Sequence, residues 1–374
     1  MTQQSTDPAD EVAARPRTIL AERVPIRRVV LIVLSVVIAV GVVYATIRTL
    51  TLPASAGRLS ATSWRDLVVF GIAQGSIYAL IALGYSLVYG ILLMINFAHG
   101  EVFMSGAFAS FFVAATLDSS GFLDRQPLLS ILLLLVVAMT VSTLVAVLLE
   151  RVAYRPLRHA PRLVPLITAI GASLFLQNTF RGFFGPQTRG YPGISTLAGS
   201  WTLLGIPVLK TQAIVIATAA VAMVGLSLFV ARTRTGKSMR AVAEDKEIAG
   251  LMGINVDRVI VTTFAIGGML AGVAGVLFAL VFGQVSPFMG FTPGIKAFTA
   301  AVLGGIGSIT GAAIGGLVLG LLEAVGPFLL LTGAHVPSPN QLKDVIAFSI
   351  LVLVLIFRPG GILGTGEPGK EGMT

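Results

Sequence analysis

The chain has 374 residues, of which 55% are hydrophobic and only 11% are charged, and its mean hydropathy is +0.91. A soluble domain carries about 25% charged residues, so this chain cannot cover a globular surface with polar groups, and its composition predicts a polytopic membrane protein. The net charge is +9. Because the basic residues fall in short loops between apolar runs, they indicate the cytoplasmic side of a membrane protein and no nucleic-acid partner.

Cysteine is absent, and the three histidines (His99, His159 and His335) lie far apart in the chain. A disulfide framework is therefore excluded, and neither a metal site nor any other cofactor is expected.

The first 28 residues are polar and contain five arginines, so residues 1–28 are predicted to be a basic, disordered cytoplasmic tail. An apolar run starts at Val29 and extends towards Leu52. A signal peptide is the alternative, since Pro53 to Ala56 resemble a cleavage site. The run is longer than the roughly 7 to 15 residues of a signal core, so we predict an uncleaved first span.

Further spans are predicted wherever an apolar run approaches the roughly 20 residues needed to cross a bilayer. About ten crossings result, the shorter of which can be broken or re-entrant helices, and an even number places both termini on one side. The expected fold is an all-α bundle of about ten helices in residues 29–363, with a flexible tail at 364–374. The later spans are predicted near Leu67–Leu92, Val102–Ala115, Leu128–Leu149, Leu163–Phe180, Ala213–Ala231, Val259–Phe282, Pro293–Leu303, Ala312–Leu331 and Val345–Phe357.

The loop charges predict the orientation. Residues Glu150–Arg162 carry four arginines and Arg232–Arg258 carry six basic residues, whereas Gly182–Gln212 has only Arg189 and Lys210. By the positive-inside rule the first two loops are cytoplasmic and the third is external, ordered against the mouth of the bundle.

Polar residues cluster within the apolar stretch from Gly71 to Phe108. Such groups are unfavourable in a membrane unless they face a partner helix or a cavity. Helix packing and capping is one interpretation. The other, favoured by the clustering, is that the turn "NFAHG" at 96–100 is unwound beside a translocation path, as in broken transporter helices. The path residues predicted here and in a second glycine-rich run are Gln74, Tyr78, Tyr85, Asn96, His99, Gly100, Glu101, Gly304, Gly305 and Gly307.

That second run, Gly294 to Gly326, is predicted to end one helix and open another. Pairs of glycines four residues apart, here and at Gly71 and Gly75, allow close helix packing. One run early and one late in the chain indicates two related halves around one path. Lys296 and Glu323 are the remaining intramembrane charges; they bind substrate or protons, or the lysine snorkels to the membrane surface.

The segment "ARTRTGKSMRAVAEDKEIAG", residues 231–250, contains the end of a phosphate-binding loop motif. The position of the required first glycine is occupied by Ala231, and the segment follows a membrane span instead of a strand, which argues against nucleotide binding. No catalytic constellation occurs elsewhere, so no enzyme activity is expected. We predict one helix, capped by Ser238 and ended by Gly253, that seats in a groove of another protein; a solvated loop is the alternative.

Three motifs carry a resemblance: "GSIYALIALGYSLVYGILLMINFAHGEVFMSGAF", "ERVAYRPLR" and "TRTGKSMRAVAEDKEIAGLMGIN". Together they resemble the permease subunits of high-affinity branched-chain amino-acid ABC importers, of the H-subunit type. The resemblance implies a permease fold with two related halves in a prokaryotic plasma membrane and transport of leucine, isoleucine and valine; related permeases carry urea, short amides or sugars.

The same resemblance implies partners: a second similar permease subunit, two cytoplasmic ATPase subunits, an extracytoplasmic binding protein and membrane lipid. A stand-alone secondary transporter, driven by ions through Lys296, Glu323 or His99, is the competing hypothesis. Residues 232–258 match the coupling loop of the family, and the residues expected to dock the ATPase are Gly236, Arg240, Ala241, Asp245, Ala249, Gly250 and Gly253.

Overall fold

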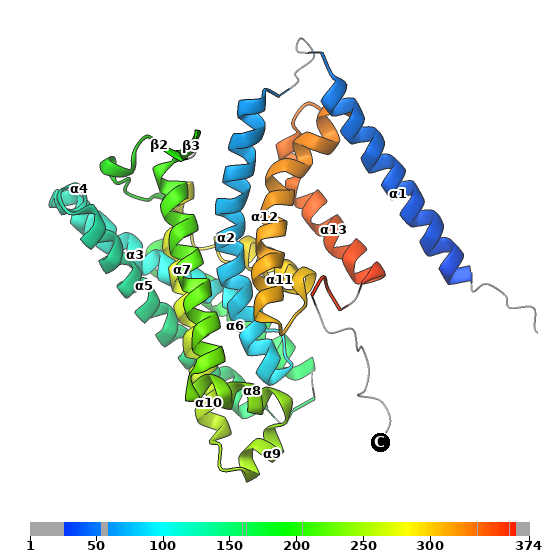
Figure 1. Ribbon diagram of the computed structural model, residues 1–374. Coiled ribbons are helices and arrows are strands. Elements are labelled where there is room, and N and C mark those ends of the chain that lie inside the picture. The colour runs from blue at the N-terminus through cyan, green and yellow to red at the C-terminus, as the bar shows by residue number, and fades with distance from the viewer. Residues whose placement is uncertain are drawn as a thin grey trace, which may run out of the picture.

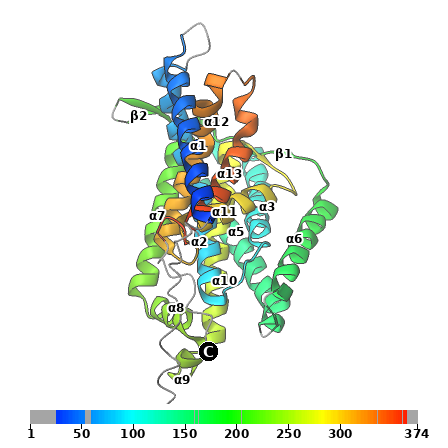
Figure 2. The same cartoon turned by 90° about the vertical axis from the view of Figure 1, so that its right-hand side faces the viewer.

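The computed structural model describes residues 26–363, except 54–58 and the single positions 159, 162, 204, 335 and 359. The predicted tail at 364–374 and all but the last three residues of the predicted tail at 1–28 lie outside the described part. The described chain is a bundle of long helices (Figures 1 and 2). Within it, nine helical segments are long and apolar enough to cross a bilayer.

The predicted spans coincide with helices. The α-helices are α1 (Ile26–Thr51), α2 (Ala61–Leu92), α3 (His99–Ser119), α4 (Phe122–Arg125), α5 (Pro127–Leu149), α6 (Leu163–Phe184), α7 (Lys210–Arg232), α8 (Arg234–Glu244), α9 (Lys246–Leu251), α10 (Val256–Phe282), α11 (Phe291–Gly304), α12 (Ile309–Leu331) and α13 (Lys343–Phe357). A π-helical turn continues α5 at Glu150–Tyr154. The short 3₁₀ turns are Arg155–Leu157, Ser195–Leu197, Thr332–Ala334 and Pro339–Leu342.

Helix α2 forms the centre of the bundle and packs against α12, α10 and α11. It is the most buried of the span-length segments, whereas α1 and α13 lie at the periphery. The hydroxyl of Ser60 caps its first turn by accepting a hydrogen bond from the N–H of Ser63, and the helix ends at Leu93, whose φ is 56°. A leucine in this left-handed conformation is strained, so the end of α2 is a sharp, enforced break.

Close packing of α2 on α12 depends on the predicted glycine pairs. A Cβ atom on Gly75 would lie 2.9 Å from the carbonyl oxygen of Gly316, and one on Gly71 would lie 3.0 Å from the Cβ of Ala324. The first contact is too short for a side chain and the second is tight, so the two backbones approach as small-residue motifs allow. The early and late glycine-rich runs therefore meet each other.

The predicted crossing at Pro293–Leu303 is the short helix α11, whose 14 residues span about 21 Å and are too few to cross the hydrocarbon core alone. It is not among the nine span-length segments of the described chain. The tenth predicted crossing is thus a short helix and not a full-length span.

Two contacts relate the ends of the described chain. The hydroxyl of Thr49, near the C-terminal end of α1, donates to the carbonyl of Leu329 (2.8 Å), near the C-terminal end of α12. The N–H of Leu363 donates to the carbonyl of Gly304 (3.0 Å), the last residue of α11, which lies just before the N-terminal end of α12. The C-terminal ends of α1 and α12 therefore meet, and the N-terminal end of α1 points away from this meeting point (Figure 1).

The predicted external loop is ordered by short strands. β2 (Ser200–Leu203) and β3 (Ile206–Leu209) form an antiparallel hairpin, and β1 (Arg189–Gly190) pairs with β4 (Gln284–Val285). The hydroxyl of Tyr191 donates to that of Ser110 on α3 (3.1 Å), which fixes the loop to the bundle as expected.

Candidate functional site

A buried polar network joins α2, α11, α12 and α13 at the first group of predicted path residues. The side-chain amide of Gln74 donates to the hydroxyl of Tyr78 (2.7 Å), which interacts with the carboxylate of Glu323 on α12. Glu323 pairs with Lys296 of α11, whose Nζ also lies 2.6 Å from Oδ1 of Asp344 on α13. From the sequence, Lys296 and Glu323 are considered as separate substrate or proton sites. In the structure they form an ion pair with each other.

The second group lies where α3 begins. The rings of Tyr85 and His99 meet edge to face with centroids 4.9 Å apart. A Cβ on Gly294 of α11 would lie 3.0 Å from the Cα of Gly100, so the first turns of α3 and α11 touch backbone to backbone. Oε1 of Glu101 accepts from the amide of Gln177 (2.7 Å), on α6. The region of the predicted "NFAHG" break therefore joins α3, α6 and α11.

Two atoms of this group have unsatisfied hydrogen-bonding capacity. Oε2 of Glu101 and Nε2 of His99 are buried and have no hydrogen-bond partner among the described residues. Glu101 lies in the first turn of α3, where the exposed N–H groups of the helix end favour a negative charge. Unpaired buried polar atoms are unfavourable, and they mark this turn as a functional candidate.

The third group lies beyond the last turn of α2. Oδ1 of Asn96 accepts from the hydroxyl of Tyr154 (2.5 Å). Gly304 packs against Gly311 where α11 turns into α12, and Gly305 has a φ of 109°, a conformation that is strained for any residue with a side chain. Of the ten predicted path residues only Gly307 is exposed, and the others are buried inside this chain. They do not form one continuous surface lining.

The predicted coupling helix is two helices, α8 and α9, and its predicted cap is wrong. Thr233, not Ser238, caps α8 by accepting from the N–H of Gly236 (3.0 Å). Asp245 ends α8 and caps α9 by accepting from the N–H of Ile248 (2.9 Å). Gly253 follows the end of α9 and has a φ of 85°, so this left-handed glycine ends the helix as predicted.

The predicted docking residues differ in exposure. Arg240, Asp245, Gly250 and Gly253 are exposed, Ala241 is half-buried, and Gly236 and Ala249 are buried. A buried alanine or glycine sets the shape of this region but offers little surface to a partner.

Sequence reasoning left three exposed apolar residues of the α9 region out of the docking set. Ile248, Leu251 and Met252 are 59%, 86% and 78% exposed. Their signal in the sequence was helical spacing, since positions 248, 251 and 252 stand at i, i+3 and i+4 and fall on one face of a helix. Outside a membrane such residues mark a surface that a partner covers.

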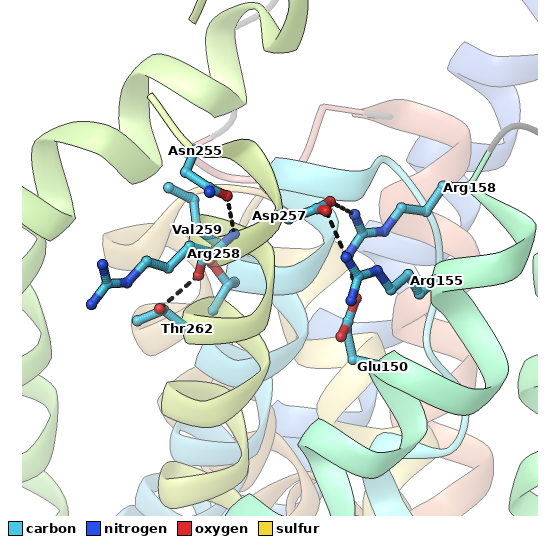
Figure 3. Close-up of polar contacts among 9 residues, drawn as sticks. Glu150, Arg155, Arg158, Asn255, Asp257, Arg258, Val259 and Thr262 are labelled. Carbon is cyan, nitrogen blue, oxygen red and sulfur yellow. Dashed lines mark hydrogen bonds and ion pairs between the residues drawn. The ribbon is translucent and has the colours of Figure 1, made fainter. Parts of the chain in front are cut away.

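An ion network holds the two basic loops together (Figure 3). The carboxylate of Asp257, at the start of α10, pairs with Arg155 (2.7 Å) and with Arg158. Arg158 also pairs with Glu150, whose side chain is fully buried. The network places the loop after α5 and the loop before α10 on one side of the bundle, as their charge predicted.

A pocket of 470 Å³ lies beside this network. It brings together the end of α2, the connection between α5 and α6, the helix α9 and the start of α10. Its walls are formed by Leu92, Leu93, Met94, Leu157, Arg158, Ala160, Pro165, Lys246, Glu247, Val256, Asp257 and Ile260. Among the described residues, no group of three or more histidine, cysteine or carboxylate side chains is placed to hold a metal ion.

Comparison with known proteins gives close relatives. The chain is 45% identical over 306 residues to the high-affinity branched-chain amino acid transport system permease protein BraD of Pseudomonas aeruginosa, covering 81% of this chain and 96% of the relative. It is 45% identical over 305 residues to LivH of Escherichia coli K12 (80% and 95%), which has the same description. The autoinducer 2 import system permease protein LsrD of Yersinia enterocolitica is 29% identical over 195 residues (50% and 55%).

No solved structure matches the chain. Residues 67–355 match the family described as the permease component of the branched-chain amino acid transport system, so α1 lies outside the matched region. With its span-length helices, the chain is a multi-pass inner-membrane protein. It belongs to the family of branched-chain amino acid transport system permease components.

Proposed function

We propose that this chain is the permease subunit of an ATP-binding-cassette importer that carries leucine, isoleucine and valine across the cytoplasmic membrane. Separate ATPase subunits supply the energy, and the chain itself catalyses no reaction. The observation that carries the proposal is the exposed apolar face of α9, on the side of the bundle that holds both basic loops. Urea, short amides and other small polar solutes are the alternative substrates.

The α8–α9 pair is the surface on which an ATPase subunit pushes. Leu251 and Met252 fill a groove of the partner, while the buried Gly236 and Ala249 hold the two helices against the bundle. Asp245 fixes the angle between them through its cap. The remaining contact or shape-setting residues of the docking region are Arg240, Ala241, Gly250 and Gly253.

The other partners follow from the two sides of the bundle. A second permease subunit completes the path within the membrane, two ATPase subunits bind the side with the basic loops, and a binding protein docks on the external hairpin side. Both termini lie in the cytoplasm, which is supported by the loop charges and by the contacts of Thr49 with Leu329 and of Leu363 with Gly304.

The translocation path uses the break before α3 and the short helix α11. The contact of Gly100 with Gly294 is where the two segments slide or separate when the path opens. His99 and Glu101, whose unpaired polar atoms lie near this contact, then face the substrate. The pairing of Lys296 with Glu323 leaves neither as a free ion-binding group and disfavours ion-coupled transport.

Reconstitution of the complete importer in vesicles tests this function. We expect ATP-dependent leucine uptake that an ionophore does not abolish. The variant Leu251→Glu should lose ATPase association and uptake, because a charge cannot enter an apolar groove. Trp201→Glu, which alters an exposed apolar residue of the external hairpin, should keep ATPase association.

Three results would contradict parts of the proposal. Normal association and uptake by Leu251→Glu would exclude the α9 assignment. Uptake by this chain alone, driven by an ion gradient, would make it a secondary transporter. ATP-dependent uptake of urea or a short amide in place of leucine would replace the substrate.

A further inference from the structure

The 470 Å³ pocket next to α9 has the dimensions of a small-molecule site, which spans about 300–1,000 Å³. Four segments far apart in the chain build it, and one of them is α9 itself. The ion network between the two basic loops uses only one edge of the pocket, at Arg158 and Asp257. The remaining walls have no role in that network.

Two positive groups face the pocket. Arg158 pairs with Asp257 and Glu150, but its Nε is buried and has no hydrogen-bond partner among the described residues. Partial desolvation and the nearby charge of Arg158 lower the pKa of Lys246 below its ordinary value. The charge of Arg158 disfavours the charged form of Lys246, so an anion bound in the pocket stabilises both cations.

The other walls complement a different part of a ligand. Glu247, next to Lys246 on α9, supplies a carboxylate for an ammonium group. Leu92, Val256 and Ile260 supply an apolar wall against which a short aliphatic side chain can pack. A carboxylate, an ammonium and an aliphatic group together describe an aliphatic α-amino acid.

We propose that this pocket binds the transported branched-chain amino acid from the cytoplasmic side and that its occupancy slows further import. The proposal rests on the function proposed above for the substrate and the orientation of the chain. A bound amino acid bridges α9 to the connection between α5 and α6. It therefore restrains the helix on which the ATPase acts, and the accumulated product inhibits its own uptake.

Transport with preloaded vesicles tests the regulation. Vesicles holding the complete importer are filled with or without leucine, and the initial rate of ATP-dependent uptake is measured. We expect internal leucine to slow wild-type uptake. Lys246→Met keeps the alkyl chain but removes the charge, and its uptake rate should be the same in empty and in leucine-filled vesicles. Lys237→Met, at an exposed lysine of α8 outside the pocket, is the matched control, and internal leucine should slow its uptake by the same fraction as in wild type.

Equilibrium binding tests the site directly. Radiolabelled leucine is bound to the complete membrane complex without the binding protein, and Lys246→Met should bind about tenfold more weakly, as expected for the loss of one charged hydrogen bond. Isocaproate, which lacks the ammonium group, and isoamylamine, which lacks the carboxylate, should compete poorly with leucine.

The outcomes separate the two proposals. If wild-type vesicles show no ATP-dependent leucine uptake, the proposed function fails. If uptake is normal but internal leucine has no effect, or if Lys246→Met is inhibited and binds like wild type, the regulatory site is wrong. Equal competition by isocaproate and inorganic phosphate would show a simple anion site and would overturn the amino-acid assignment.

Discussion

The ammonium group of Lys296 on α11 is paired with the carboxylate of Glu323 on α12, and their side chains are only 4% and 1% exposed. A lone charge inside an apolar bundle is far less stable than a pair. Because α11 is too short to cross the membrane, this pair is one of the contacts that hold it between longer helices.

Breaking this pair should destabilise the protein. Glu323→Leu leaves Lys296 with only the half-exposed Asp344, and we expect a loss of about 3–5 kcal/mol in the free energy of unfolding. The double variant Lys296→Met/Glu323→Leu removes both buried charges and should recover most of that loss. Denaturant unfolding in detergent measures both; a double variant as unstable as the single one would contradict the pairing argument.

The contact between α2 and α12 should not tolerate a side chain at Gly75. Gly75→Val forces a methyl group against the backbone of Gly316 and should lower stability by at least about 1–3 kcal/mol, the usual effect of overpacking. Gly171→Val, on an exposed face of α6 with open space around it, is the control and should be near neutral. Yield and thermal stability of the purified protein distinguish the two, and equal losses would rule out the close approach as the cause.

The cap of α9 should affect the coupling region locally. Asp245→Ala removes the acceptor for the N–H groups of Glu247 and Ile248 and should weaken the helix by about 1 kcal/mol, whereas Asp245→Asn should retain most of the cap. Hydrogen exchange at those two amides is the measurement. Unchanged exchange in Asp245→Ala would show that the cap does not hold α9.

The bond between Tyr154 and Asn96 should stabilise the break before α3. Tyr154→Phe leaves the buried Oδ1 of Asn96 without its donor and should lower the free energy of unfolding by about 1–3 kcal/mol. Tyr44→Phe, at a tyrosine of α1 that is 64% exposed, should change it little. Equal effects of the two substitutions in denaturant unfolding would exclude a special role for the buried bond.

The spans were predicted well from the sequence because apolar length is a local property. Thr233 and Asp245 show where prediction failed: each of several Ser, Thr and Asp residues in that loop can cap a helix, and the backbone path selects which one does. The division into α8 and α9 was therefore missed, although the left-handed end at Gly253 was predicted correctly.

The candidate site was only partly predictable. Polar residues within apolar runs identified Tyr78 and Glu101 as unusual, but their partners Glu323 and Gln177 lie on distant helices. The grouping of path residues into separate clusters, and the burial of Ala249, depend on which helix faces pack together.

Composition and apolar run length are enough to establish a helical, multi-pass membrane protein, because they set how much of the chain water can solvate. The loops that carry positive charge and the glycines that permit close approach are also readable from the chain alone. The pairing of Lys296 with Glu323, and the meeting of Arg158 and Lys246 in one pocket, emerge only when the helices are packed together. Such pairings depend on helix rotation and register, which arise from contacts between distant segments and leave no local pattern in the chain.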